Sequence, residues 1–166
     1  MEIVRPLRFC GDALEILDQT LLPGKEVRKR LRTPDEVIEA ISALRVRGAP
    51  AIGVAGAYAL VLAAGSAEDV RRAAPRVAAA RPTAVNLRWA VDRMLRRLRT
   101  APAGSVREAL LDEADRIRSE DEAACRAIGR HGAALLGNRT AVLTHCNAGS
   151  LATAGGLVFL GRNDGR

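Results

Sequence analysis

The stretch GAPAIGVAGAYALVLAAGSA, residues 48–67, has no charged side chain at any position. About 20 apolar residues is the length at which a helix can span a membrane. Most residues of the stretch are nevertheless glycine or alanine, and the strongly apolar ones are Ile52, Val54, Leu60, Val61 and Leu62. A helix that is apolar all round but built from small side chains suits close packing among other helices. We therefore expect a helix from about Pro50 in the core of a helical domain, and no membrane span.

Capping signals before this stretch predict another helix. Thr33 and Glu36 have the spacing of a capping box, and Pro34 suits the first helical position. The buried stripe of this helix is expected to be Val37, Ile41 and Leu44.

Three more helices are expected after the stretch. One starts at Ser66 and is expected to bury Val70, Ala74 and Val77. The apolar stripe of the next consists of Leu87, Val91, Met94, Leu95 and Leu98, and Trp89 on the same helix is interpreted as a core residue. Ser105 and Glu108 form a second capping box, which opens a long helix to about Leu136.

The two ends of the chain have strand character. Residues 7–32 contain apolar runs that end at the turn signal Pro23-Gly24, and basic residues then alternate with apolar ones. TAVLTHC, residues 140–146, predicts a short buried strand that leads into a turn. We therefore expect a mainly α fold. A small N-terminal antiparallel β element plus a helical bundle fill residues 1–137, and the first β-turn-α of a second domain fills residues 138–166.

Composition limits the possible classes of protein. Of the 166 residues, 48% are hydrophobic and 27% charged, which is ordinary for a folded globular protein. The net charge is +7, but only four residues are aromatic, too few for a base-stacking platform, so nucleic acid is not an expected partner. Cys10, Cys125 and Cys146 include no CxxC pair, which argues against a disulfide framework or a zinc site. Without a visible signal peptide, a reducing cytoplasm is expected.

Two segments have the residues of an anion site, and a third carries a thiol. Arg47 and Gly48 precede a helix start, where a guanidinium and free backbone N–H groups suit a phosphate, although a plain inter-helix turn has the same pattern. Arg81 precedes Pro82 in a similar setting. Cys146 lies where the predicted strand meets a helix start, which favours a thiolate, although packing is the commoner role of an unpaired cysteine. The other two cysteines have no such setting and are expected to be packing residues.

Several long motifs occur in one order along the chain. They are LEILDQTLLP (14–23), VRGAPAIGVAGAYAL (46–60), ARPTAVNLRWAVDRM (80–94), EDEAACRAIGRHGAALL (120–136) and VLTHCNAGSLATAG (142–155). Together they resemble the methylthioribose-1-phosphate isomerase family, which is related to the regulatory subunits of the eukaryotic initiation-factor exchange complex. The resemblance extends over residues 7–155.

This resemblance implies a fold, a reaction and a set of site residues. Residues 138–166 would be the start of an incomplete Rossmann-like domain. The implied reaction is the isomerisation of methylthioribose 1-phosphate to methylthioribulose 1-phosphate in methionine salvage, with no cofactor or metal. By motif, Cys146 corresponds to the catalytic cysteine, which stabilises the transition state. Arg47, Gly48, Ala49 and Arg81 correspond to substrate-binding residues. A phosphorylated pentose is the expected partner, and the family forms homodimers.

The chain also departs from the family pattern. Family members are about twice as long, their catalytic aspartate falls in the half that has no counterpart here, and the sequence from Gly156 no longer follows theirs. We therefore expect an incomplete active site and little isomerase activity from these 166 residues alone. Two alternatives stay open. One is a non-catalytic sugar-phosphate-binding or assembly module, and the other is an isomerase of another pentose 1-phosphate such as ribose 1,5-bisphosphate.

Overall fold

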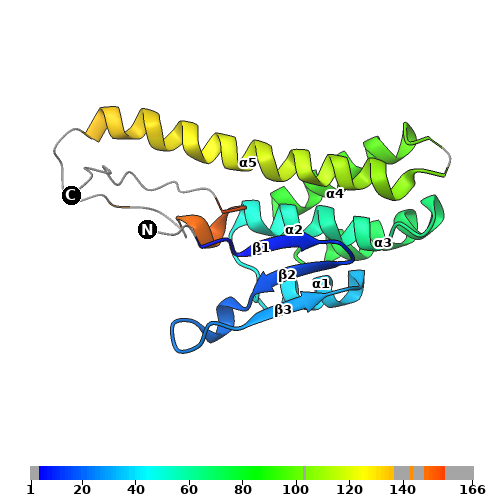
Figure 1. The fold of residues 1–166 in the computed structure, drawn as a ribbon, viewed down its shortest axis with the longest axis horizontal. Helices are drawn as coiled ribbons and strands as arrows, with labels where there is room; N and C mark the ends of the chain where they lie inside the picture. The colour runs from blue at the N-terminus through cyan, green and yellow to red at the C-terminus, as the bar shows by residue number, and fades with distance from the viewer. Residues whose placement is uncertain (1–3, 103, 137–142, 144–147, 156–166) are drawn as a thin grey trace.

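A computed structural model describes residues 4–102, 104–136, 143 and 148–155 of the chain. The sheet consists of β1 (Leu7–Cys10), β2 (Ala13–Leu17) and β3 (Arg28–Leu31), which pair antiparallel in that order. The helices are α1 (Pro34–Ser42), α2 (Ala49–Leu62), α3 (Ala67–Ala79), α4 (Val85–Arg99) and α5 (Val106–Leu136), with 3-10 turns η1 (Gln19–Leu21) and η2 (Ser150–Ala152). The sheet lies on one side of α2 and α5 on the other (Figure 1). The expected mainly helical fold with a small β element is confirmed, whereas the strand predicted over 140–146 falls almost wholly outside the described residues.

Helix α2 is the centre of the core. Every residue from Ala51 to Val61 is buried, and α1, α3, α4, α5 and the sheet all contact the helix. Its small residues admit the neighbours closely, since a Cβ added at Gly56 would lie 2.4 Å from Cδ1 of Leu87. The prediction of a core helix is therefore confirmed. In the part of the chain that the structure describes, no helix is long and apolar enough to cross a membrane.

An aromatic pair joins the sheet to the helices. The rings of Phe9 on β1 and Tyr58 on α2 stack with centroids 4.9 Å apart. The Tyr58 hydroxyl donates a hydrogen bond of 2.6 Å to Oδ1 of Asp115 on α5. Because Tyr58 is only 1% exposed, three layers of the fold meet at this side chain.

The start of α1 agrees with the sequence prediction, but its end does not. Thr33 and Glu36 form the expected capping box, and Val37 and Ile41 are buried. The prediction that Leu44 is buried is wrong. It is 43% exposed and has a φ of 60°, because α1 ends at Ser42 and the chain turns before the next buried residue.

Candidate functional site

The RGA motif lies at the N-terminal end of α2. Gly48 is the N-cap residue, with a φ of 90°, and no side chain caps the helix. Among the described residues, no side chain accepts a hydrogen bond from the first-turn N–H groups of Ala49 and Ala51, and Pro50 has no N–H to satisfy. Free N–H groups and the helix dipole together favour an anion at such an end.

The second motif forms the start of α4 in the same manner. Arg81 lies in the turn before the helix, and its carbonyl accepts a hydrogen bond from the backbone N–H of the N-cap residue Ala84. In the described part of the chain, α4 likewise has no capping side chain. By contrast, Thr33 caps α1 and Ser66 caps α3. Among the described residues, the two helix starts that carry the RGA and RPTAVN motifs thus have no capping side chain, whereas α1 and α3 are capped by Thr33 and Ser66.

The open ends of α2 and α4 lie close together. A Cβ built on Gly53, one turn into α2, would be 3.0 Å from the carbonyl oxygen of Asn86, at the start of α4. This contact is tighter than an ordinary van der Waals separation. The two helix N-termini are therefore at the same end of the bundle.

Residues 148–155 complete this end of the molecule. A Cβ on Gly48 would lie 2.3 Å from the carbonyl oxygen of Ala152 and 2.4 Å from its Cα, so η2 packs directly on the N-cap of α2. Figure 1 shows η2, in orange, at the end of the bundle where β1 begins. Parts of three of the five motifs named above (46–60, 80–94 and 142–155) thus meet in the structure.

The segment that holds η2 is fixed by two polar side chains. Nε2 of Gln19 donates to the carbonyl oxygen of Leu151 at 2.8 Å, and the N–H of Ala154 donates to Oδ2 of Asp121 at 2.8 Å. Burial raises the pKa of the Asp121 carboxyl, although the hydrogen bond from Ala154 opposes this shift. Neither Gln19 nor Asp121 was singled out in the sequence, because each acts through a contact with residues far along the chain.

The arginines near this end fall into two groups. Arg45 is paired, because hydrogen bonds with Glu39 and with Asp18, the latter at 2.8 Å, hold its guanidinium and raise its pKa. Arg47 is exposed and Arg81 half-buried, and within the described residues neither side chain has an ion pair or a hydrogen bond. A guanidinium group can form charge-assisted hydrogen bonds to an anion such as a phosphate.

The carboxylate that holds Arg45 is deeply buried. Asp18 has no exposed surface. Burial by itself would raise the pKa of its carboxyl, but hydrogen bonds from Thr20, Arg45 and Lys29 outweigh that effect and lower the pKa to about 2. Asp18 therefore stays ionised at neutral pH and serves as a fixed anchor behind the motif.

The cysteines divide between the described and undescribed parts of the chain. Cys125 on α5 is buried, and burial raises the pKa of its thiol, as expected for a packing residue. Cys10 is half-buried at the end of β1. Cys146 lies outside the described residues, so its assignment stays a prediction from the sequence. In the described ranges no group of three or more His, Cys, Asp or Glu side chains could hold a metal ion.

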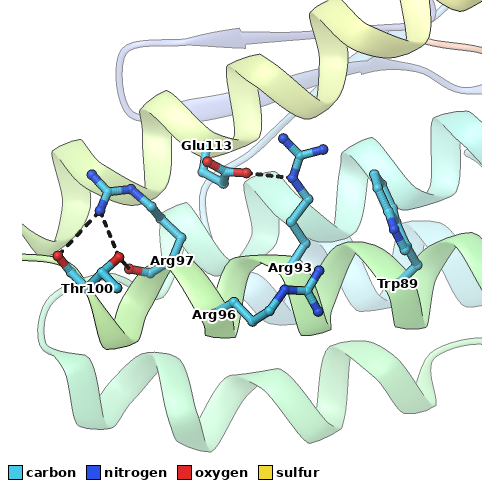
Figure 2. Close-up of a pocket in the computed structure, with 6 residues that line it drawn as sticks. All are labelled: Trp89, Arg93, Arg96, Arg97, Thr100 and Glu113. Carbon is cyan, nitrogen blue, oxygen red and sulfur yellow. Dashed lines mark hydrogen bonds and ion pairs between the residues drawn. The ribbon is translucent and has the colours of Figure 1, made fainter.

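A basic groove lies between α4 and α5, away from these helix ends (Figure 2). It has a volume of about 470 Å³ and is lined by Trp89, Arg93, Arg96, Arg97, Thr100 and Glu113. Trp89 is 46% exposed, so its assignment to the core is wrong: its indole lies at the groove, under the guanidinium of Arg93. Arg93 is in turn paired with Glu113 at 2.5 Å and with Glu120. Of the predicted site residues, the four that the structure describes (Arg47, Gly48, Ala49 and Arg81) do not line this groove.

Comparisons with known proteins agree with the resemblance found in the sequence. Residues 45–160 match the model of the Initiation factor 2 subunit family. A methylthioribose-1-phosphate isomerase of Anaeromyxobacter sp. strain Fw109-5 is 58% identical over 147 residues, which are 87% of this chain and 42% of that protein. A 5-deoxyribose 1-phosphate isomerase of Moorella thermoacetica is 49% identical over 165 residues, covering 92% of this chain and 47% of the relative.

A solved structure gives the same result for the fold. The crystal structure of the translation initiation factor eIF-2B, subunit delta, from A. fulgidus superposes with a TM-score of 0.81 at 40% identity. The match covers 91% of this chain and 47% of that one. The chain thus spans about half the length of the relatives it matches.

Proposed function

The chain belongs to the initiation factor 2 subunit family, and we propose that its site at the N-terminal ends of α2 and α4 binds the phosphate of a pentose 1-phosphate that is isomerised to the corresponding ketose. One observation carries this proposal. Two uncapped helix N-termini and the segment 148–155 converge at one end of the fold, next to two arginines with no ion pair among the described residues.

The phosphate is the group that this end suits best. N–H groups of Ala49 and Ala51 supply donors and the positive end of the α2 dipole, and Arg47 and Arg81 supply charge-assisted hydrogen bonds. Because Arg45 is already held by Asp18 and Glu39, it orders the chain before the site and does not compete for the ligand.

The names of the relatives indicate the class of substrate. One acts on methylthioribose 1-phosphate and another on 5-deoxyribose 1-phosphate. Both names describe a ribose 1-phosphate that lacks the 5-hydroxyl group. The two substrates differ in the group that replaces this hydroxyl. We propose the same class here, with the 1-phosphate at the helix ends.

Every bond that the isomerisation breaks or forms belongs to the substrate, so no co-reactant is needed. The phosphate on C1 prevents simple ring opening, so the C2–H bond and the ring C1–O bond both have to break. A C1–H bond and a C2 carbonyl form, and the proton of the C2 hydroxyl ends on the former ring oxygen. Donors that are fixed before the reaction, in a site that excludes water, stabilise the charge that develops along this path. On the family pattern, Cys146 is proposed to stabilise that transition state.

Binding of ribose-type 1-phosphates tests the proposal. We expect Arg47→Ala and Arg81→Ala each to weaken binding of methylthioribose 1-phosphate by about 10-fold or more, because a hydrogen bond to a charged group contributes about 1.5–3 kcal/mol. Arg99→Ala is the matched control, since Arg99 is an exposed arginine at the far end of α4. Equal affinities for Arg47→Ala, Arg99→Ala and the wild type, measured by calorimetry, would overturn the phosphate site.

An assembly role is the second candidate, favoured by the similarity to an initiation factor subunit. The two functions are separated by following the conversion of the aldose phosphate by nuclear magnetic resonance. Because little activity is expected from these 166 residues, even slow ketose formation supports the isomerase if it is lost in Cys146→Ser. Stable self-association with neither sugar-phosphate binding nor conversion supports the assembly module.

A further inference from the structure

We propose that Gln19 is a positioning residue that holds the two sides of this phosphate site in register, an inference that rests on the proposed function. Gln19 lies in η1, between β2 and β3, and is only 9% exposed. A buried amide side chain is costly unless it is hydrogen-bonded, so its partners define what it does.

Gln19 contacts both sides of the site. Its backbone N–H donates to the carbonyl oxygen of Arg45 at 3.0 Å, which fixes the chain two residues before Arg47. Its side-chain Nε2 donates to the carbonyl oxygen of Leu151 at 2.8 Å, which fixes η2. The next residue, Ala152, is the one that packs on Gly48. Gln19 therefore links η2 directly to the chain that leads into the RGA motif.

Asp18 makes this anchor rigid. Its Oδ1 accepts hydrogen bonds from the backbone N–H of Thr20 at 3.1 Å and from the Thr20 hydroxyl at 2.6 Å, so Asp18 caps η1. Its Oδ2 accepts from Nη1 of Arg45 at 2.8 Å. The turn that carries Gln19 is consequently locked to the same Arg45 that Gln19 contacts through its backbone.

A second tether makes the effect of Gln19 separable from folding. Asp121 holds Ala154 independently, from α5. Loss of the Gln19 amide should therefore loosen η2 locally, without releasing residues 148–155 altogether. Gln19→Met keeps the length of the side chain and removes the donor. Gln19→Asn keeps an amide but is one methylene too short to reach Leu151, and it serves if the methionine variant folds poorly.

The matched control is Tyr58→Phe. It removes another buried hydrogen bond, that to Asp115, in the centre of the fold and away from η2. A merely structural loss, as in this control, lowers the melting temperature and leaves local protection of 148–155 and ligand affinity unchanged. Loss of a positioning residue changes both the local protection of residues 148–155 and the ligand affinity.

The experiment measures amide hydrogen exchange of residues 148–155 together with the affinity for ribose 1-phosphate. For Gln19→Met we expect exchange in that segment to be about 5-fold faster, the factor that corresponds to one neutral hydrogen bond, and the dissociation constant to rise about 3- to 10-fold. Tyr58→Phe should change neither. Unchanged exchange in both Gln19→Met and Gln19→Asn overturns the proposal, whatever the wild type binds. A wild type that binds no sugar phosphate, but whose segment is loosened by Gln19→Met, overturns the proposed function and leaves the anchor role supported.

Discussion

Replacement of Gly48 by alanine tests the contact on which the site is built. Gly48 has a φ of 90° and a ψ of 135°, a sparsely populated conformation that costs a residue with a Cβ about 1–3 kcal/mol. The added Cβ would also lie 2.3 Å from the carbonyl oxygen of Ala152 and 2.6 Å from its Cβ, far inside an ordinary contact of about 3.5–4.0 Å. Either η2 or the start of α2 has to move.

The structure sets the size of the effect. Displacing η2 gives up the hydrogen bond from Gln19 to Leu151, about 1 kcal/mol, and the burial of the methyl group of Ala152, about 1 kcal/mol more. Gly104 offers a matched control, because its φ is 86° and a Cβ there would meet nothing within 4 Å. Gly48→Ala should therefore cost about 2 kcal/mol more than Gly104→Ala. For a chain of this size that difference corresponds to a further drop of about 4–8 °C in melting temperature.

The assay is thermal unfolding of the two variants, followed by circular dichroism, together with binding of ribose 1-phosphate. Gly48→Ala should melt lower than Gly104→Ala and bind more weakly, whereas Gly104→Ala should bind as the wild type does. Equal melting temperatures for the two variants, with wild-type binding in both, would refute the packing of η2 against the N-cap of α2.

Three further predictions concern stability and the basic groove. The pKa of Asp18 is lowered to about 2, below its usual 3.8, so the ionised carboxylate stabilises the fold by about 2 kcal/mol above pH 4, and this is lost as the pH falls toward 2. Urea unfolding should thus find Asp18→Asn less stable than the wild type at pH 7, with the difference shrinking between pH 4 and pH 2. Tyr58→Phe should lower the free energy of unfolding by about 1–2 kcal/mol, through loss of the hydrogen bond to Asp115, and a loss below the error of urea titration would count against that bond. Trp89→Ala should lower the free energy of unfolding by less than about 1 kcal/mol beyond the loss of surface packing, because the contact between its half-exposed indole and Arg93 is weak. It should leave sugar-phosphate affinity unchanged, since the indole lies in the groove and not at the helix ends. Weaker binding in calorimetry would place the site at the groove instead.

Local signals in the sequence predicted much of the fold. The capping box at Thr33 and Glu36 and the starts of α3 and α5 depend on residues within one turn, and all three helices are found where expected. The prediction that Leu44 is buried was wrong, because a periodic stripe of apolar residues does not show where a helix ends. The assignment of Trp89 to the core was wrong, because a large apolar residue at helical spacing can also lie at a groove beside a cation.

The site was only partly predictable, and the reason is physical. Arg47 and Arg81 were singled out as candidates because each precedes a helix start, a pattern that is visible in the sequence, and the structure places both before such starts. Their role in binding stays a prediction. Asp18, Gln19 and Asp121 were not found, because their roles depend on contacts across 27, 132 and 33 positions of the chain respectively. Such partners are fixed by tertiary packing and leave no periodic trace.

Amide chemical shifts during a titration with ribose 1-phosphate test most directly whether the three segments surround one phosphate. The amides of Ala49, Ala51 and Asn86, and those of residues 149–151, should shift together with a single dissociation constant, and the shifts should vanish in Arg47→Ala. Shifts confined to Arg96 and Arg97 in the groove between α4 and α5, with none at the helix ends, would contradict a phosphate site at the open ends of α2 and α4.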